Sequence, residues 1–167
     1  KTFSLAMQIA QEMGILNQGD LVVQTAGTLT GISGSTDLIK VGLVRKIVSR
    51  GISIGEIGVT GKARIIRTNL DLSLICPGEI LFVPKEILEN VPLSKNIAGI
   101  VTDQNVDDVY SLFNKKNKKI STICNLENIF DHQIINGDLV TLQLNEGVIY
   151  MGQIEDDEEA IDKYKYV

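Results

Sequence analysis

The sequence has few of the residues that carry metals and covalent chemistry. It contains two cysteines and one histidine in 167 residues. Cys76 and Cys124 stand far apart and form no CxxC motif, which argues against a metal site and for a reducing, cytoplasmic setting. We expect both cysteines to be small buried hydrophobic residues. His132 follows Asp131, but adjacent residues have no fixed side-chain geometry, so we expect a surface or structural histidine.

The sequence also lacks a surplus of positive charge. It has 16 Lys and Arg against 21 Asp and Glu, a net charge of -5. A nucleic-acid-binding face would need clustered basic residues, so we expect no nucleic-acid partner. No apolar run approaches the roughly 18 residues of a membrane span, and no signal-peptide pattern opens the chain. Because the chain begins with Lys1 instead of Met, we expect it to be a piece of a longer polypeptide.

Hydrophobic residues make up 44% of the chain, enough to fill a core. Apolar residues recur at three- and four-residue spacing over residues 2–16, which predicts a helix that Gly14 ends. Two apolar runs, 21–23 and 38–41, predict strands. About ten residues rich in glycine and hydroxyl groups separate them, although a minimal hairpin needs roughly two.

The second half predicts short strands separated by turns. Residues 42–60 have no clear periodicity and are interpreted as a connector, and NEG at 145–147 predicts a hairpin turn. The predicted strands are Ala63–Arg67, Glu79–Val83, Ile97–Thr102, Lys119–Cys124, Asp138–Leu144 and Val148–Met151.

One further helix is predicted over residues 105–119. Val106, Val109, Tyr110 and Phe113 fall at i, i+3, i+4 and i+7 and predict one apolar stripe. Acidic residues fill the first turn and lysines the last, as the helix macrodipole favours.

Two stretches resemble a known family. The sequence GDLVVQTAGTLTGISGSTDLIKV, residues 19–41, resembles the end of the C-terminal domain of pyruvate kinases, where a strand, a glycine-rich loop and a final strand follow one another. The stretch from GKARIIRT to NGDLVTLQLNEGVIYMG is similar to an additional domain of many bacterial pyruvate kinases. That domain in turn resembles the swivelling phosphohistidine domain of phosphoenolpyruvate-utilising enzymes.

The resemblance implies an α/β fold in two parts. Residues 1–44 would be the second half of the C-terminal effector domain, a helix plus two strands. Residues 45–60 would be a connector, and residues 61–153 a β/β/α swivelling domain. Residues 154–167 would form an acidic tail.

The same resemblance implies that the glycine-rich loop belongs to an allosteric site for a phosphorylated sugar or a nucleotide. The loop that cradles the phosphate in this family would precede the chain, so only part of the site would be present. Glycines let backbone N–H groups approach a ligand closely. The alternative is a glycine-rich surface turn. The candidate effector-binding residues are Gly31, Ser33, Gly34, Ser35 and Thr36.

The phosphohistidine motif of the relatives falls on residues 105–111, with Tyr110 at the position of the histidine. Tyrosine has no imidazole nitrogen, and Val106 stands where a glycine is usual. Asp107 and Asp108 would repel a phosphoryl group. We therefore expect a degenerate domain that carries no phosphate, with Tyr110 packed in the core.

By resemblance, the parent protein transfers phosphate from phosphoenolpyruvate to ADP with magnesium and potassium. This chain would hold neither the active site nor a cofactor, and would serve regulation or assembly. A helix with two strands is marginal alone, so we expect self-association, as in an oligomeric parent. The alternatives are a free-standing interaction module and a small-molecule sensor that uses the glycine-rich loop.

Overall fold

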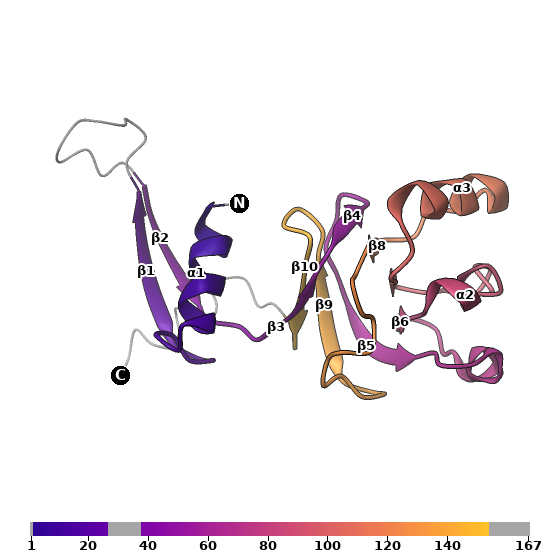
Figure 1. The fold of residues 1–167 in the computed structure, drawn as a ribbon, viewed down its shortest axis with the longest axis horizontal. Helices are drawn as coiled ribbons and strands as arrows, with labels where there is room; N and C mark the ends of the chain where they lie inside the picture. Colours follow the sequence, from indigo (N-terminus) through magenta and orange to yellow (C-terminus); the bar gives the residue numbers. More distant parts are fainter. Residues whose placement is uncertain (1, 27–37, 154–167) are drawn as a thin grey trace. The chain divides into compact units, whose positions relative to one another are not determined.

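The computed structural model describes residues 2–26 and 38–153. The described chain divides into two compact units (Figure 1). We call Lys1–Lys46 the N-terminal unit and Ile47–Gln153 the barrel unit. Each unit is described by itself.

The N-terminal unit has the predicted helix and strand pair. Helix α1 spans Thr2–Glu12 and ends before Gly14, whose φ of 70° is the left-handed conformation that stops a helix. Strands β1 (Leu21–Ala26) and β2 (Leu38–Leu43) pair antiparallel. The prediction of one helix followed by two strands is confirmed for the described residues.

The barrel unit is built on one eight-stranded sheet in the order β3-β10-β9-β5-β6-β7-β8-β4. Strands β5, β6, β7 and β8 run parallel, and the other pairings are antiparallel. The strands are β3 (Ile47–Arg50), β4 (Ile52–Ile54), β5 (Val59–Ile65), β6 (Ile80–Phe82), β7 (Gly99–Val101), β8 (Thr122–Cys124), β9 (Leu139–Gln143) and β10 (Val148–Met151).

The two end strands of this sheet are neighbours in the chain. Only Gly51 separates β3, which pairs with β10, from β4, which pairs with β8. The sheet therefore closes on itself at Gly51. The N–H of Gly51 donates to the Gly147 carbonyl at 3.0 Å. A Cβ at Gly51 would clash with the Cys124 carbonyl and lie 2.7 Å from Cγ2 of Ile123, so only glycine fits the crossing.

Residues 45–60 differ from the predicted connector. They contain β3, β4 and the start of β5, all hydrogen-bonded in the barrel. The two short strands have no clean in–out alternation: β3 is half-buried at every position, and β4 runs from exposed to buried. A period of two cannot show itself over three or four such residues, and the intervening glycines suggested a loop.

Strands β6, β7 and β8 are buried at every residue because both of their faces are covered. Ile80 and Phe82 belong to one hydrophobic cluster, and Leu81 belongs to a second cluster. The cluster of Leu81 also includes residues of helices α2 (Lys85–Leu88) and α3 (Val106–Lys116). These helices lie on the side of the parallel strands away from β9 and β10 (Figure 1). A 3₁₀-helix, η1, spans Asn69–Leu74.

Helix α3 confirms the predicted element and its cap but corrects its buried face. The side chain of Asn105 accepts a hydrogen bond from the N–H of Asp108 at 2.9 Å, an N-cap. Val109, Leu112 and Phe113 are buried, whereas Tyr110 is 44% exposed. The expectation that Tyr110 packs in the core is wrong. Successive helical residues are rotated by about 100°. The buried stripe is formed by Val109, Leu112 and Phe113, and Tyr110 lies outside it.

Candidate functional site

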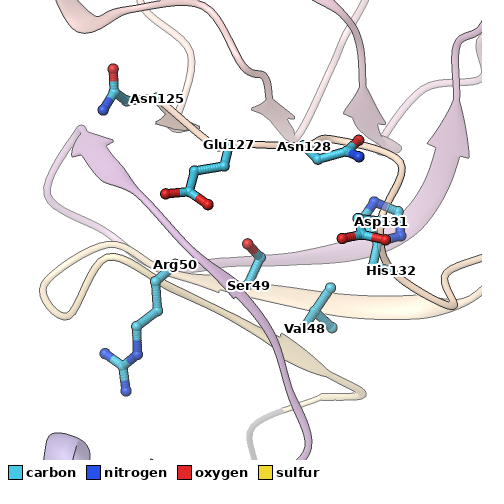
Figure 2. A pocket seen from close by; sticks show the side chains of 8 residues that line it. All are labelled: Val48, Ser49, Arg50, Asn125, Glu127, Asn128, Asp131 and His132. Carbon is cyan, nitrogen blue, oxygen red and sulfur yellow. The ribbon is translucent and has the colours of Figure 1, made fainter.

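The barrel unit contains a polar cavity of about 400 Å³ between strand β3 and the loop that follows β8 (Figure 2). The two walls come from distant parts of the chain. Closure of the barrel brings the two walls together. Strand β3 continues through Gly51 into β4, and β4 pairs with β8, the strand from which the loop starts. The lining residues are Val48, Ser49, Arg50, Asn125, Glu127, Asn128, Asp131 and His132.

The loop after β8 begins with a left-handed residue. Asn125 has φ of 63°, a conformation that asparagine tolerates better than most side chains. Its N–H donates to the carbonyl of Gln104 at 2.8 Å, and the N–H of Leu126 donates to the carbonyl of Thr102 at 3.3 Å. These bonds hold the start of the loop against the segment that connects β7 to α3.

Asn128 shapes the middle of the loop. Its side-chain oxygen accepts a hydrogen bond from the N–H of Phe130 at 3.0 Å, so the asparagine caps the turn. Figure 2 shows that the carboxylates of Glu127 and Asp131 and the hydroxyl of Ser49 face the same space, whereas the side chain of Arg50 points away from it. The cavity is therefore rich in acceptors.

His132 forms part of the wall as a neutral ring. Its Nδ1 accepts a hydrogen bond from the N–H of Ile134 at 3.2 Å, which places the ring hydrogen on Nε2. The ring packs edge-on against Phe82 with centroids 4.8 Å apart. Burial lowers the pKa of His132, and the charge of Arg67 acts in the same direction. The Ile129 carbonyl, the backbone of His132 itself and the charge of Asp131 act in the opposite direction.

Nε2 of His132 is buried, and within the described part of the chain no acceptor lies at hydrogen-bonding distance from it. The nitrogen therefore does not open onto the cavity as a base or nucleophile. This agrees with the predicted structural role. The arrangement can hold a molecule by hydrogen bonds, and it shows no nucleophile–base pair.

The start of α3 is the place to which the resemblance assigns the degenerate phosphohistidine motif. Tyr110 is exposed there, and Asp107 and Asp108 occupy the first turn. The amide nitrogen of Asn105 donates to the Asp108 carboxylate at 2.7 Å, in addition to the N-cap bond. The match of Tyr110 to the histidine position stays a prediction.

The candidate effector residues lie outside the described residues. Gly31, Ser33, Gly34, Ser35 and Thr36 all fall in the stretch 27–37, and their role stays a prediction.

Within residues 2–26 and 38–153, no group of three or more His, Cys, Asp or Glu side chains could hold a metal ion. In the same ranges no helix has the length and apolarity that crossing a membrane requires.

The two cysteines differ. Cys124 is buried as predicted, its thiol donates to the Ile52 carbonyl at 3.3 Å, and burial raises its pKa to about 11. Cys76 is exposed, so the expectation of a buried residue is wrong for this position. It lies just before β6, next to the exposed turn residues Pro77 and Gly78.

Sequence reasoning missed an ion pair beside Cys76. Arg64 on β5 donates twice to Glu79, from Nη2 at 2.7 Å and from Nε at 3.1 Å. The pairing of Ala63 with Ile80 in neighbouring parallel strands brings these two residues together. The sequence did contain a signal, because Arg64 and Glu79 carry opposite charges and lie at the beginnings of two predicted strands.

The comparisons with known proteins give a consistent relationship. Pyruvate kinase 2 of Synechocystis sp. is 36% identical over 154 residues, which cover 92% of this chain and 26% of that protein. The pyruvate kinase of Staphylococcus haemolyticus is 31% identical over 148 residues, or 88% of this chain and 25% of that protein. The chain belongs with the pyruvate kinases. It spans about a quarter of the length of these relatives.

No model of a protein family matches the chain. Among solved structures, the microcin immunity protein MccF reaches a TM-score of 0.41 at 14% identity, covering 88% of this chain and 56% of that one. Enzyme I reaches 0.35 at 19% identity, covering 53% of this chain and 35% of that one. Neither likeness is close enough to bear on fold or function.

Proposed function

We propose that the chain is the C-terminal regulatory and assembly region of a pyruvate kinase. The parent enzyme transfers phosphate from phosphoenolpyruvate to ADP, with magnesium and potassium, and this region contributes no catalytic group. One observation carries the proposal: the identity of 36% extends over 92% of the chain while the match spans only 26% of the relative.

The N-terminal unit supports the assembly role. Among residues 2–26 and 38–46 its sheet has two strands, and a two-stranded unit is marginal alone. Leu21 and Val23 on β1 and Ile39 on β2 lie on one face, because Thr25, which shares the face of Val23, pairs with Ile39. Their exposed fractions are 42%, 64% and 66%. We call these three residues the hairpin face.

Helix α1 carries a second exposed apolar stripe. Leu5 and Ile9 on the helix and Met13 just after its end follow one another at four-residue spacing, and all three are exposed. A set of exposed apolar side chains of this kind is typical of a surface that another polypeptide covers. The proposed occupant is another copy of the same polypeptide or the remainder of the parent subunit.

The start of α3 supports a region that does not carry phosphate. A helix N-terminus attracts anions through free N–H groups and the helix dipole. Here the N–H of Asp108 is occupied by Asn105, and the carboxylates of Asp107 and Asp108 stand in the first turn. Tyr110 offers a phenol in place of an imidazole.

The glycine-rich loop is the proposed contribution to an effector site. Its glycines and hydroxyls suit the oxygens of a sugar phosphate or nucleotide. Thermal shift with ribose 5-phosphate, fructose 1,6-bisphosphate and AMP tests this part. The test uses the full gene product, since this chain would hold only part of the site; stabilisation by at least one of them supports the proposal, and the absence of any shift contradicts it.

The proposed function is tested on the natural gene product. Its mass should correspond to about four times the length of this chain, because the match spans about a quarter of the relatives. The full product should convert phosphoenolpyruvate and ADP to pyruvate and ATP, and deletion of residues 1–153 should lower the number of subunits in its oligomer. A natural product of this chain's own size would support the free-standing module instead.

A further inference from the structure

The cavity between β3 and the β8–β9 loop has the volume of a small-molecule site and a mainly polar lining. Empty packing defects in proteins are lined by apolar side chains. This cavity is lined mainly by polar ones, and its volume of about 400 Å³ lies in the range of small-molecule pockets, roughly 300–1,000 Å³. Ser49 from β3 faces the same space as Glu127 and Asp131 from the loop (Figure 2).

Hydrogen-bond donors line the same cavity. The side-chain oxygen of Asn128 is taken by the N–H of Phe130 at 3.0 Å, which leaves its amide NH₂ to donate elsewhere. Asn125 also lines the cavity, and its backbone N–H is held by the Gln104 carbonyl. The cavity thus combines amide donors, carboxylate acceptors and one hydroxyl.

This combination selects against anionic ligands and favours groups that can both donate and accept hydrogen bonds. A phosphate or carboxylate would meet the negative charges of Glu127 and Asp131, while the side chain of Arg50 points away (Figure 2). An ammonium group could donate to the carboxylates of Glu127 and Asp131, but it has no lone pair with which to accept from the asparagine amides. A hydroxyl group donates and accepts, so it satisfies both kinds of partner.

We propose that this cavity binds a neutral polyhydroxylated molecule of the size of a monosaccharide, an unphosphorylated sugar or sugar alcohol. Its hydroxyls donate to Glu127 and Asp131 and accept from the asparagine amides, and Val48 offers an apolar wall for its C–H groups. The site uses residues of the barrel unit only. It shares no residue with the proposed effector loop.

The test is an NMR titration of the whole isotope-labelled chain with D-ribose and D-glucose, and with ribose 5-phosphate as the charged counterpart. We expect saturable shifts of the backbone amides of residues 48–50 and 125–132 with at least one sugar. Ribose 5-phosphate should bind these residues at least tenfold more weakly than ribose. The variants Asp131→Asn and Glu127→Gln should each weaken sugar binding at least fivefold.

Asp107→Asn serves as the matched control, because Asp107 is an exposed carboxylate on α3 and does not line the cavity. Its sugar affinity should equal that of the unchanged chain. Glu127 and Asp131 are exposed, so their variants should keep a dispersed native spectrum. Three outcomes overturn the proposal: no saturable shift with either sugar, tighter binding of ribose 5-phosphate, or unchanged affinity in both cavity variants.

Discussion

The guanidinium of Arg64 and the carboxylate of Glu79 form a two-point ion pair across the parallel strands β5 and β6. Glu79 is 6% exposed and also accepts a hydrogen bond from the N–H of Cys76 at 2.8 Å. The charge is therefore compensated on both of its oxygens. The guanidinium is the partner that tolerates this burial, because it presents two N–H groups in the plane of the carboxylate.

Replacing Glu79 by alanine should destabilise the barrel unit. The change removes three hydrogen bonds and leaves Arg64 without its counter-charge. Breaking a fully buried pair costs about 3–5 kcal/mol, and the 21% exposure of the Arg64 side chain reduces that figure to about 2–3 kcal/mol. Urea unfolding measures the change. Glu86→Ala, at an exposed carboxylate on α2, is the control and should cost less than about 0.5 kcal/mol.

The buried ring of His132 predicts a loss of stability on mild acidification. Its pKa is lowered in the folded state by burial, so the unfolded chain binds a proton more readily. Stability is therefore full above the unfolded pKa of about 6.5 and is lost as the pH falls through the folded pKa. Protonation of Nδ1 would also break the bond from the Ile134 N–H.

Thermal melts between pH 7.5 and pH 5 test this prediction in a window above the titration of ordinary carboxylates, about 4. The melting temperature of the unchanged chain should fall with pH. In His132→Gln it should be lower at pH 7.5 but should vary less with pH. An equal slope in both proteins would contradict the role given to the histidine.

Gly51→Ala should disturb closure of the barrel. The added methyl group would meet the Cys124 carbonyl, which cannot move without breaking the pairing of β8 with β4. Overpacking in a tight core costs about 1–3 kcal/mol, and we expect the upper end of that range here. Gly42→Ala is the comparison, because a Cβ there meets no atom within 4 Å. Equal unfolding midpoints for the two variants would contradict the account of the crossing.

The hairpin face predicts self-association that a single charge can weaken. Val23→Lys places an ammonium group in the centre of the apolar patch formed with Leu21 and Ile39. Sedimentation should show a smaller mean mass for this variant than for the unchanged chain at equal concentration. Lys62→Glu is the control, at an exposed residue of the barrel unit, and should leave the mass unchanged. A monomeric unchanged chain would contradict the prediction.

Elements with strong local signals could be predicted from the sequence. Helix α3 combines a period of 3.6 residues, an N-capping Asn105 and charges that suit the dipole, and its bounds match the prediction closely. Strands β9 and β10 flank the turn over residues 145–147, and both were found. In each case local preference and tertiary packing favour the same structure.

The remaining features depend on contacts that no local pattern encodes. Strands β3 and β4 are too short to show a period, and only their pairing with β10 and β8 makes them strands. Tyr110 fits an apolar stripe by spacing, yet the neighbouring elements cover the side of the helix that bears Leu112. Ser49 and Asp131 line the same cavity although they are far apart in the sequence. The sequence alone does not show the barrel closure that brings them together.

Closure at Gly51 has a consequence for any attempt to isolate the second domain. A truncated gene that starts at residue 61, the boundary suggested by the family resemblance, would omit β3 and β4 and leave the free edges of β10 and β8 open. Unpaired edges of this kind recruit other chains. Such a fragment would be prone to precipitate, whereas one that starts at Ile47 would retain a closed sheet.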